Sequence, residues 1–265
     1  MDNSEMQIFV VSHSEEDIRK IKSDEVYTPL FVGRNGKNNF GFCSDDSGEN
    51  ISDKNSDLSE LTGLYWMWKN TNPKIIGLCH YRRYFKNDNG KLLNRSDIKN
   101  YLNNYDILMP KKIHLIKNSL KETYDGTYYI PVFAETRKIM ENLYPDYLHI
   151  YDKIMSQDSF SCYNMFVTSK IIMNDYCNWL FPIINELENQ IDLEVEKRII
   201  GVITEYLFNV WVEYQNLRVK ELNIFYLGNM LKFRMFLSKN YFFRKLYLTA
   251  SKNNKIENFI HNFFY

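Results

Sequence analysis

The stretch Ile75-Ile-Gly-Leu-Cys-His80-Tyr81-Arg82-Arg83-Tyr-Phe85 decides the fold. Its first five residues form an apolar run typical of a buried strand, which leads directly into His80, Arg82 and Arg83. A continuous strand would place His80 and Arg82 on one side and Tyr81 and Arg83 on the other. Ligands bind at the carboxyl ends of strands in open α/β sheets, and arginines there suit a phosphate or diphosphate. Surface salt bridges to nearby acids are an equally good explanation of these residues taken alone.

Strands and helices alternate on both sides of this stretch, which predicts an α/β domain with a mostly parallel central sheet. The helical content rises toward the C-terminal part of the chain. We expect strands at 7–12, 75–79, 105–109, 159–167 and 219–225, and helices at about 58–68, 97–103, 131–143, 171–191 and 196–214.

The 265 residues carry no formal net charge, so composition gives no case for nucleic-acid binding. The four cysteines are isolated, which favours reduced thiols and the cytosol. Residues 1–6 are polar and acidic and do not form a signal peptide, and no apolar run reaches 18 residues.

A basic, aromatic tail follows the main domain. Residues 228–265 contain seven lysines and arginines but one glutamate, with phenylalanines and tyrosines between them. We therefore divide the chain into a domain at 1–227 and a helical tail at 228–265. Such a tail suits an anionic membrane surface, although a helix packed on the domain or a dimer contact explains it as well.

A long polar loop, residues 33–55, precedes the helix at 58–68, and it contains Asp45 and Asp46. These two carboxylates are suited to a divalent cation or to sugar hydroxyls, but a solvated turn is the better explanation by composition. The sequence contains no P-loop, no G-x-S-x-G and no H-E-x-x-H motif.

Two further carboxylates are candidates for acid–base chemistry. Glu205 lies in an almost entirely apolar helix, where an unpaired carboxylate is costly unless it is functional. A structural ion pair with Arg83 or Arg198 is the alternative. Asp158 immediately precedes the strand at 159–167. A partly buried carboxylate with a raised pKa is what a general base for a sugar hydroxyl requires.

The segments 50–70 and 77–85 together resemble a family of bacterial glycosyltransferases catalogued as domain of unknown function 4422. Shorter stretches at 163–166, 176–182 and 205–211 resemble it in the same order. The resemblance covers roughly residues 6–226 and leaves the tail outside.

The resemblance implies a GT-A-like, Rossmann-type sandwich and a hexosyltransferase that uses a UDP-sugar, with galactose or galactofuranose favoured. It further implies a saccharide acceptor, usually lipid-linked, and a place in bacterial capsule, exopolysaccharide or O-antigen synthesis. An enzyme of this kind works in the cytoplasm, as a peripheral protein at the inner face of the cytoplasmic membrane.

The resemblance also suggests where the donor binds. Ser12 and His13 occupy the usual place of the nucleotide base, and His80-Tyr81-Arg82 stands where many GT-A enzymes carry a metal-binding Asp-x-Asp. The polar residues that match the family's motif around the donor are Asp45, Asp46, Asn50, Ser52, Asn55, Glu60 and Thr62.

We therefore expect His80, Arg82 and Arg83 to stabilise the departing diphosphate in place of a metal. If the enzyme does use Mn²⁺ or Mg²⁺, Asp45 and Asp46 are the candidate ligands. Glu205 is the first candidate for the base and Asp158 the second, and a single base without a nucleophile favours inversion. A non-catalytic carbohydrate-binding protein and a nucleotidyl- or phosphotransferase are the competing functions.

Overall fold

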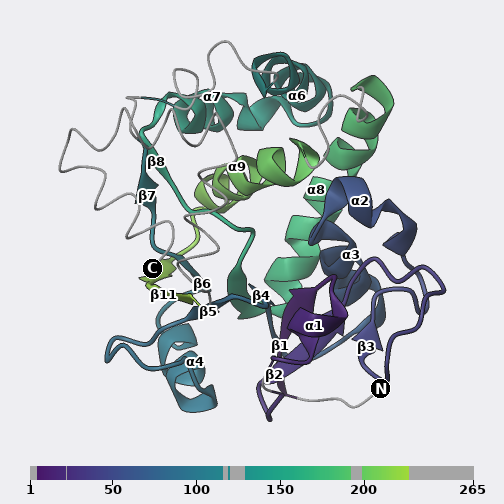
Figure 1. Cartoon of the computed structure of the whole chain (residues 1–265). Helices are drawn as coiled ribbons and strands as arrows, with labels where there is room; N and C mark the ends of the chain where they lie inside the picture. The colour runs from purple at the N-terminus through teal and green to yellow at the C-terminus, as the bar shows by residue number, and fades with distance from the viewer. Residues whose placement is uncertain (1–4, 22, 116–118, 120–128, 192–198, 227–265) are drawn as a thin grey trace, which may run out of the picture.

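The computed structural model describes residues 5–21, 23–115, 119, 129–191 and 199–226 (Figure 1). The basic tail predicted at 228–265 lies outside the described residues. Within the described ranges no helix is both long enough and apolar enough to cross a membrane.

A central sheet is covered by helices on both faces. Its strands are β1 (Met6–Ser12), β2 (Tyr27–Phe31), β3 (Cys43–Ser44), β4 (Ile75–His80), β5 (Arg83–Phe85), β6 (Ile107–Pro110), β9 (Phe166–Ser169), β10 (Val219–Leu222) and β11 (Ile224–Tyr226). A second, small sheet contains β7 (Ile113–His114) and β8 (Ser159–Phe160). The helices are α1 (Glu15–Ile18), α2 (Asn55–Leu58), α3 (Leu61–Asn70), α4 (Arg95–Leu102), α6 (Tyr129–Leu143), α7 (Leu148–Ser156), α8 (Lys170–Gln190) and α9 (Ile199–Tyr214), with 3-10 turns η1 (Ser52–Lys54) and η2 (Pro145–Tyr147).

The strand order of the central sheet is β10-β6-β9-β4-β1-β2-β3, and β5 links β4 to β11. Strand β1 lies between β2 and β4 and is parallel to both. Strand β9 is antiparallel to its neighbours β4 and β6, so β6 runs in the same direction as β4. The predicted α/β class with a mostly parallel sheet is confirmed. The apolar runs at β1 and β4 are long because both faces of these strands are buried.

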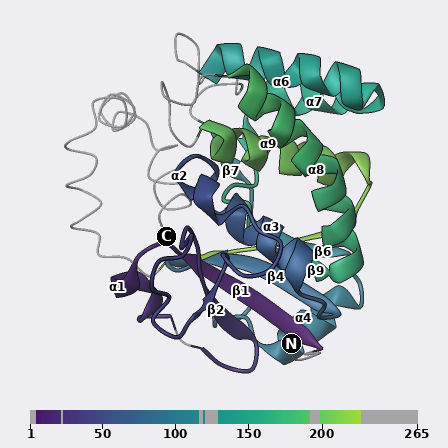
Figure 2. The ribbon, with the colours of Figure 1, turned by 90° about the vertical axis from the view of Figure 1, so that its right-hand side faces the viewer.

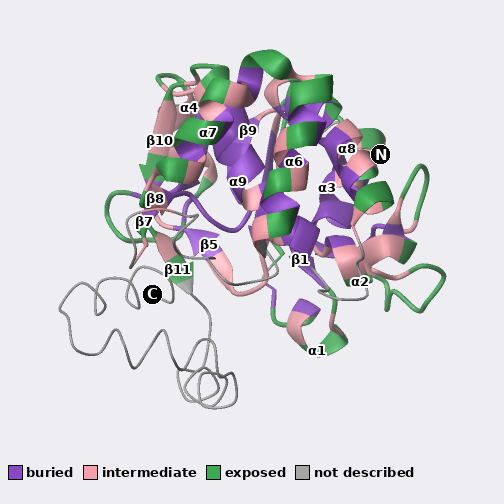
Figure 3. Cartoon of the chain, turned by 90° about the horizontal axis from the view of Figure 1, so that it is seen from above, coloured by how far each residue is buried: buried purple, intermediate pink, exposed green. Residues whose placement is uncertain are grey.

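In Figure 2, α3 and α8 lie over one face of the sheet, and α6 and α7 lie farther from it. Helix α3 packs against α8, and α8 packs against β4 and β9. Helix α9 contacts α2, α7 and α8, and its side chains are buried nearly all round, as its apolar sequence predicts (Figure 3). Gly63 permits close contact of α3 with the sheet, because a Cβ there would lie 2.9 Å from Val11 Cγ1.

The prediction of one strand at 159–167 is wrong. The segment forms two short strands in different sheets, β8 and β9, separated by a turn. Tyr163 and Asn164 in this turn have φ angles of 79° and 50°, which no strand can contain. Asn is disfavoured in strands and tolerates the left-handed region, so the Tyr-Asn pair interrupts an otherwise strand-like pattern.

The predicted helix at 58–68 is interrupted at its start. Helix α2 ends at Leu58, Ser59 takes φ 54° and ψ −126°, and α3 begins at Leu61. The interruption places Glu60 at the N-terminus of α3, facing the turn at Tyr163 and Asn164.

Candidate active site

Several strands and loops end together at the carboxyl edge of the sheet. The register pairs Val11 with His80 and Ser12 with Phe31, so β1, β2 and β4 end at the same level. Strand β3 pairs Ser44 with Phe31, so the loop that begins at Asp45 leaves from this edge too. Strand β9 runs the other way and begins here, immediately after the Tyr163–Asn164 turn. The sequence segments predicted to bind a donor therefore lie at one edge.

The strand at the centre of this edge reverses immediately after His80. Strand β5 runs antiparallel to β4 and pairs Arg83 directly with His80. The predicted grouping of His80 with Arg82 is therefore wrong, because it assumed that the strand continues. Tyr81 and Arg82 form the tip of the reversal, and the Tyr81 N–H donates to Val11 O across 3.1 Å.

The two arginines diverge from this reversal. The Arg83 guanidinium lies over the Tyr163 ring, 4.3 Å from its centroid. Arg82 lies 3.5 Å from Asp17 of α1 and covers the Tyr81 ring at 4.6 Å. Arg83 therefore faces the Tyr163–Asn164 turn, whereas Arg82 faces the loop after β1.

His80 is held by the same turn. Its Nε2 lies 2.6 Å from Tyr163 O, and because a carbonyl only accepts, Nε2 carries the hydrogen. Burial lowers the pKa of His80, an effect that the Glu60 charge opposes and the Arg83 charge reinforces. His80 is thus a neutral donor at pH 7, and Arg83 supplies the fixed positive charge at this point.

Asn164 joins three elements through its side-chain amide. Its Nδ2 donates to Glu60 Oε1 at 2.7 Å, to Thr204 Oγ1 at 3.1 Å and to Gly201 O at 3.4 Å. Its Oδ1 is buried and has no partner among the described residues. Asn164 thus connects the N-terminus of α3 to the first half of α9.

Glu205 projects from α9 toward the same turn. Burial of its carboxyl, reinforced by the nearby charge of Glu60, raises the pKa of Glu205 to about 8. The Tyr163 N–H and the Arg83 charge act in the opposite direction. The fold therefore brings four groups to this turn, which are the Arg83 guanidinium, the neutral His80 imidazole and the carboxyl groups of Glu60 and Glu205.

The polar loop at 33–55 is held together around Asp45. Asp45 is fully buried, and its carboxylate accepts from Gly33 N, Arg34 N, Ser52 Oγ and Thr62 Oγ1. Asn55 Nδ2 donates to Thr62 Oγ1 at 2.9 Å and to Ser59 O at 2.6 Å. These contacts stabilise the loop itself, so Asp45 acts as an anchor for backbone and hydroxyl donors.

Asp46 and Asn50 extend this internal network. Asp46 accepts from Gly36 N at 3.0 Å and from the Ser44 hydroxyl, while Asn50 Oδ1 accepts from Ser52 N at 3.2 Å. Among the described residues no group of three or more His, Cys, Asp or Glu side chains is arranged to hold a metal ion.

Three further predicted site residues are Ser12 and His13 at the end of β1 and Asp158 beside β8. Ser12 is buried at the end of β1 and accepts from Ser14 N, and exposed His13 lies edge-on to the Tyr81 ring at 6.4 Å. The predicted role of Ser12 and His13 in binding the nucleotide base stays a prediction. Asp158 lies on the small sheet with its side chain 56% exposed, 3.8 Å from His114. Nothing in the described part of the chain connects Asp158 to Glu205.

Sequence reasoning missed Tyr163, Asn164 and Thr204 as site residues. The signal for Asn164 was present, because an asparagine in the middle of a predicted strand indicates a turn. Thr204 gave no such signal, since threonine is common in buried helices whose hydroxyl bonds to the preceding turn.

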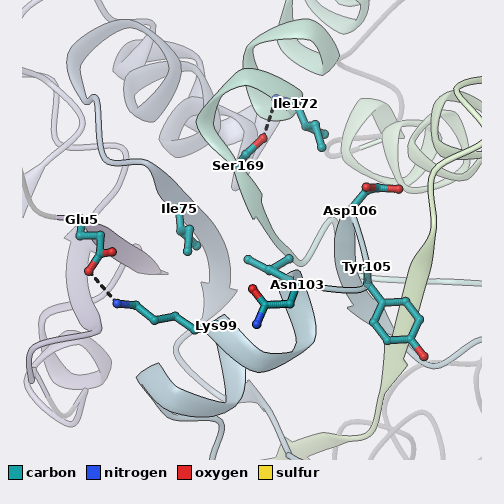
Figure 4. Close-up of a pocket in the computed structure, with 9 residues that line it drawn as sticks. Glu5, Ile75, Lys99, Asn103, Tyr105, Asp106, Ser169 and Ile172 are labelled. Atoms are coloured by element: carbon teal, nitrogen blue, oxygen red, sulfur yellow. Dashed lines mark hydrogen bonds and ion pairs between the residues drawn. The ribbon is translucent and has the colours of Figure 1, made fainter.

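The largest of the described pockets lies at the opposite edge of the sheet (Figure 4). It has a volume of about 570 Å³, and its lining includes Glu5, Lys99, Asp106 and Ser169. Glu5 is paired with Lys99 at 2.8 Å, and Asp106 is paired with Arg218 at 2.7 Å. These two carboxylates of the pocket are therefore neutralised by basic side chains of the protein.

Comparisons with known proteins identify the fold and the family of the chain. The solved apo structure of WbbM, a bifunctional glycosyltransferase, is similar with a TM-score of 0.73 and 30% sequence identity, over 84% of this chain and 45% of that chain. The chain thus spans less than half of WbbM, and the match is consistent with the predicted GT-A-like fold. No curated protein gives a significant match. The family model described as domain of unknown function (DUF4422) matches residues 7–216, so the chain belongs to the DUF4422 family.

Proposed function

We propose that the protein is a glycosyltransferase that moves a hexosyl group from a UDP-sugar to a saccharide hydroxyl. The observation that carries this proposal is the convergence of Arg83, His80 and Glu205 on the Tyr163–Asn164 turn at the carboxyl edge of the sheet. The similarity to a bifunctional glycosyltransferase supports it independently. Galactose and galactofuranose are the favoured sugars, as the resemblance of the sequence implies.

Arg83 and His80 bind the diphosphate of the donor in this proposal. As the bond between the anomeric carbon and the diphosphate oxygen breaks, negative charge develops on the leaving group. A fixed guanidinium and a fixed imidazole N–H stabilise that charge more strongly in the transition state than in the ground state. The enzyme then needs no metal. If Mn²⁺ or Mg²⁺ is required after all, EDTA should abolish the stabilisation by UDP in the assay below.

Glu205 takes the proton of the acceptor hydroxyl group. The oxygen of that hydroxyl group forms the new bond to the anomeric carbon as the bond to the diphosphate breaks. A carboxylate with a raised pKa is a stronger base than an exposed one, which suits a hydroxyl group. Attack from the face opposite the leaving diphosphate inverts the anomeric centre. Arg82 contacts Asp17 in the segment after β1, and in this proposal it binds the nucleotide together with Ser12 and His13.

The acceptor is proposed to be lipid-linked, in capsule, exopolysaccharide or O-antigen synthesis at the inner face of the bacterial cytoplasmic membrane. The support for this step is the basic, aromatic sequence at 228–265.

The donor site is tested by the binding of UDP, UDP-galactose, UDP-glucose and CMP, measured as thermal shifts with and without EDTA. We expect stabilisation by UDP and its sugars but not by CMP or free galactose, and loss of at least tenfold in UDP affinity in Arg83→Ala. Arg218→Ala is the matched control, because Arg218 pairs with Asp106 away from this edge. Stabilisation by free sugars alone would indicate a carbohydrate-binding protein instead.

A further inference from the structure

The two carboxylates of the site are held by one turn. Asn164 Nδ2 donates to Glu60 Oε1 at 2.7 Å, and the adjacent Tyr163 N–H donates to the Glu205 carboxyl. Glu60 comes from the N-terminus of α3 and Glu205 from the second turn of α9, so nothing in the sequence places them together. The turn is the element that fixes both.

The orientation of the Asn164 amide follows from its partners. A carboxylate and a backbone carbonyl only accept hydrogen bonds, so the atom that faces Glu60 and Gly201 O must be the nitrogen. Thr204 gives its own hydrogen to Gly201 O at 2.8 Å, which leaves Thr204 Oγ1 as an acceptor for the same amide. Glu60 is thus held by a donor that has no alternative orientation.

The backbone of the turn is strained. Tyr163 and Asn164 both take positive φ, and for tyrosine this conformation costs roughly 1 kcal/mol or more. The surrounding contacts maintain it: the His80 side chain binds Tyr163 O, and the Arg83 guanidinium covers its ring. Strain of this kind is retained where the conformation serves a function.

We propose that Asn164 is a positioning residue: its amide fixes the Glu60 carboxylate against the turn that also holds Glu205, and this placement prepares Glu205 to accept the proton of the attacking hydroxyl. The proposal rests on the assignment of Glu205 as the base. Glu60 acts through its charge and not by contact with the reacting atoms.

Few other charges lie near Glu205. Arg83 is the cation that faces it, and burial raises the pKa of Cys162 and lowers that of His80, so both are neutral at pH 7. The other Asp, Glu, His and Lys side chains on α9 and on the elements packed against it are Asp57 of α2, Asp146 of η2, His149, Asp152 and Lys153 of α7, Lys170, Asp175, Glu186 and Glu188 of α8, and Glu213 of α9. Lys153 pairs with Glu213, Asp152 with Arg137, and Lys170 Nζ donates to two carbonyls of α3. Glu60 is therefore the negative charge that we expect to act on Glu205.

The test is a pH titration of the glutamate side chains by NMR, with ¹³C at the carboxyl carbon and Glu205→Gln to assign the signal. We expect Glu60→Gln to lower the titration midpoint of Glu205 by about 1 pH unit. Asn164→Gly keeps the left-handed backbone accessible and removes only the side chain, and it should lower the midpoint in the same direction. If this variant does not fold, Asn164→Ser replaces it.

A double variant separates positioning from a general loss of structure. If Asn164 acts through Glu60, Asn164→Gly has no further effect on the midpoint once Glu60 is Gln. Asn209→Ala is the matched control, because Asn209 is also buried and joins α9 to the same segment. It binds Ser161 N and O and donates to the backbone carbonyl of Glu205 at 2.8 Å, but it makes no hydrogen bond to Glu60. This variant should leave the midpoint unchanged.

Additive shifts in the double variant, or an equal shift in Asn209→Ala, would overturn the positioning role. The titration needs no substrate, so it is independent of the transfer assay. If the midpoints move as expected but Glu205→Gln transfers sugar at the wild-type rate, the base assignment fails and the positioning contact stands.

Discussion

At the scale of single residues, the local environment separates side chains that look alike in the sequence. Asp45 and Glu205 are both acidic residues in buried surroundings, yet Asp45 receives four hydrogen bonds from backbone and hydroxyl donors. Glu205 receives the Tyr163 N–H and faces the Glu60 charge, and its pKa rises to about 8. The first arrangement holds a loop together, and the second produces a base.

The Glu205 carboxyl gives a pH dependence with a defined sign. Transfer needs the ionised form, so we expect kcat/KM to rise with pH and to level off above about pH 8.

The same carboxyl makes the stability of the fold depend on pH. Because the pKa of Glu205 is raised in the folded state, its contribution to stability is fully present below the ordinary value near 4.5 and is lost as the pH rises through 8. Glu205→Gln should therefore gain stability relative to the wild type between pH 4.5 and 8, while transfer falls about 10²–10⁴-fold. Measuring the urea midpoint and the initial rate across this pH range checks both effects. A flat stability difference would contradict the environment described for this residue.

The Asp45 anchor predicts a loss of stability. Asp45→Ala leaves buried N–H and O–H donors without an acceptor, and we expect it to reduce the free energy of unfolding by about 3 kcal/mol. Asp53→Ala in the same region is the control, because Asp53 is exposed. Urea denaturation of both variants makes the comparison. Equal, small effects would mean that the loop does not depend on Asp45, and Asp45 would then return as a candidate ligand for a metal.

At the scale of elements, the site is formed by interruptions of the strands, which are the reversal after His80 and the turn at Tyr163 and Asn164. The apolar run of β4 predicts a buried strand correctly, because hydrophobic runs depend only on burial. Neither the reversal after His80 nor the turn at Tyr163 and Asn164 is visible in that pattern, since each depends on backbone angles and on partners distant in sequence. Glu205 could be identified from sequence because a carboxylate contrasts with an apolar helix, whereas Thr204 could not. The sequence grouped His80 with both arginines, but the direct pairing of His80 with Arg83 across the reversal required the structure.

The break between α2 and α3 predicts a gain of stability. Ser59 holds a φ of 54° with a ψ of −126°, a combination that favours glycine, and its Oγ is buried without a partner among the described residues. Ser59→Gly should raise the free energy of unfolding by about 1 kcal/mol. Ser59→Ala removes the hydroxyl but keeps the strain, so it should gain less. Thermal and urea unfolding of the two variants separate these contributions, and a loss of stability in Ser59→Gly would mean that the hydroxyl has a partner.

At the scale of the whole molecule, the described fold closes before the basic tail begins. Strand β11 pairs with β5 at Ile224–Tyr226, directly beside the reversal that carries His80 and Arg83. Residue 227 therefore follows in sequence a strand that lies beside the proposed donor site.

The tail predicts membrane binding that is separable from donor binding. The protein truncated after residue 227 keeps every described strand, so we expect it to retain its fold and its stabilisation by UDP. The full chain should float with vesicles that contain anionic lipid, and the truncated chain should not, because seven lysines and arginines at 228–265 supply the attraction.

A full-length variant with Lys232, Arg234, Arg244 and Lys245 changed to Gln tests the contribution of charge alone, since its aromatic residues remain. Flotation should weaken in that variant and in 0.5 M salt. If the truncated protein floats as well as the full chain does, the membrane contact belongs to the domain, and a packed helix or a dimer contact becomes the explanation of the tail.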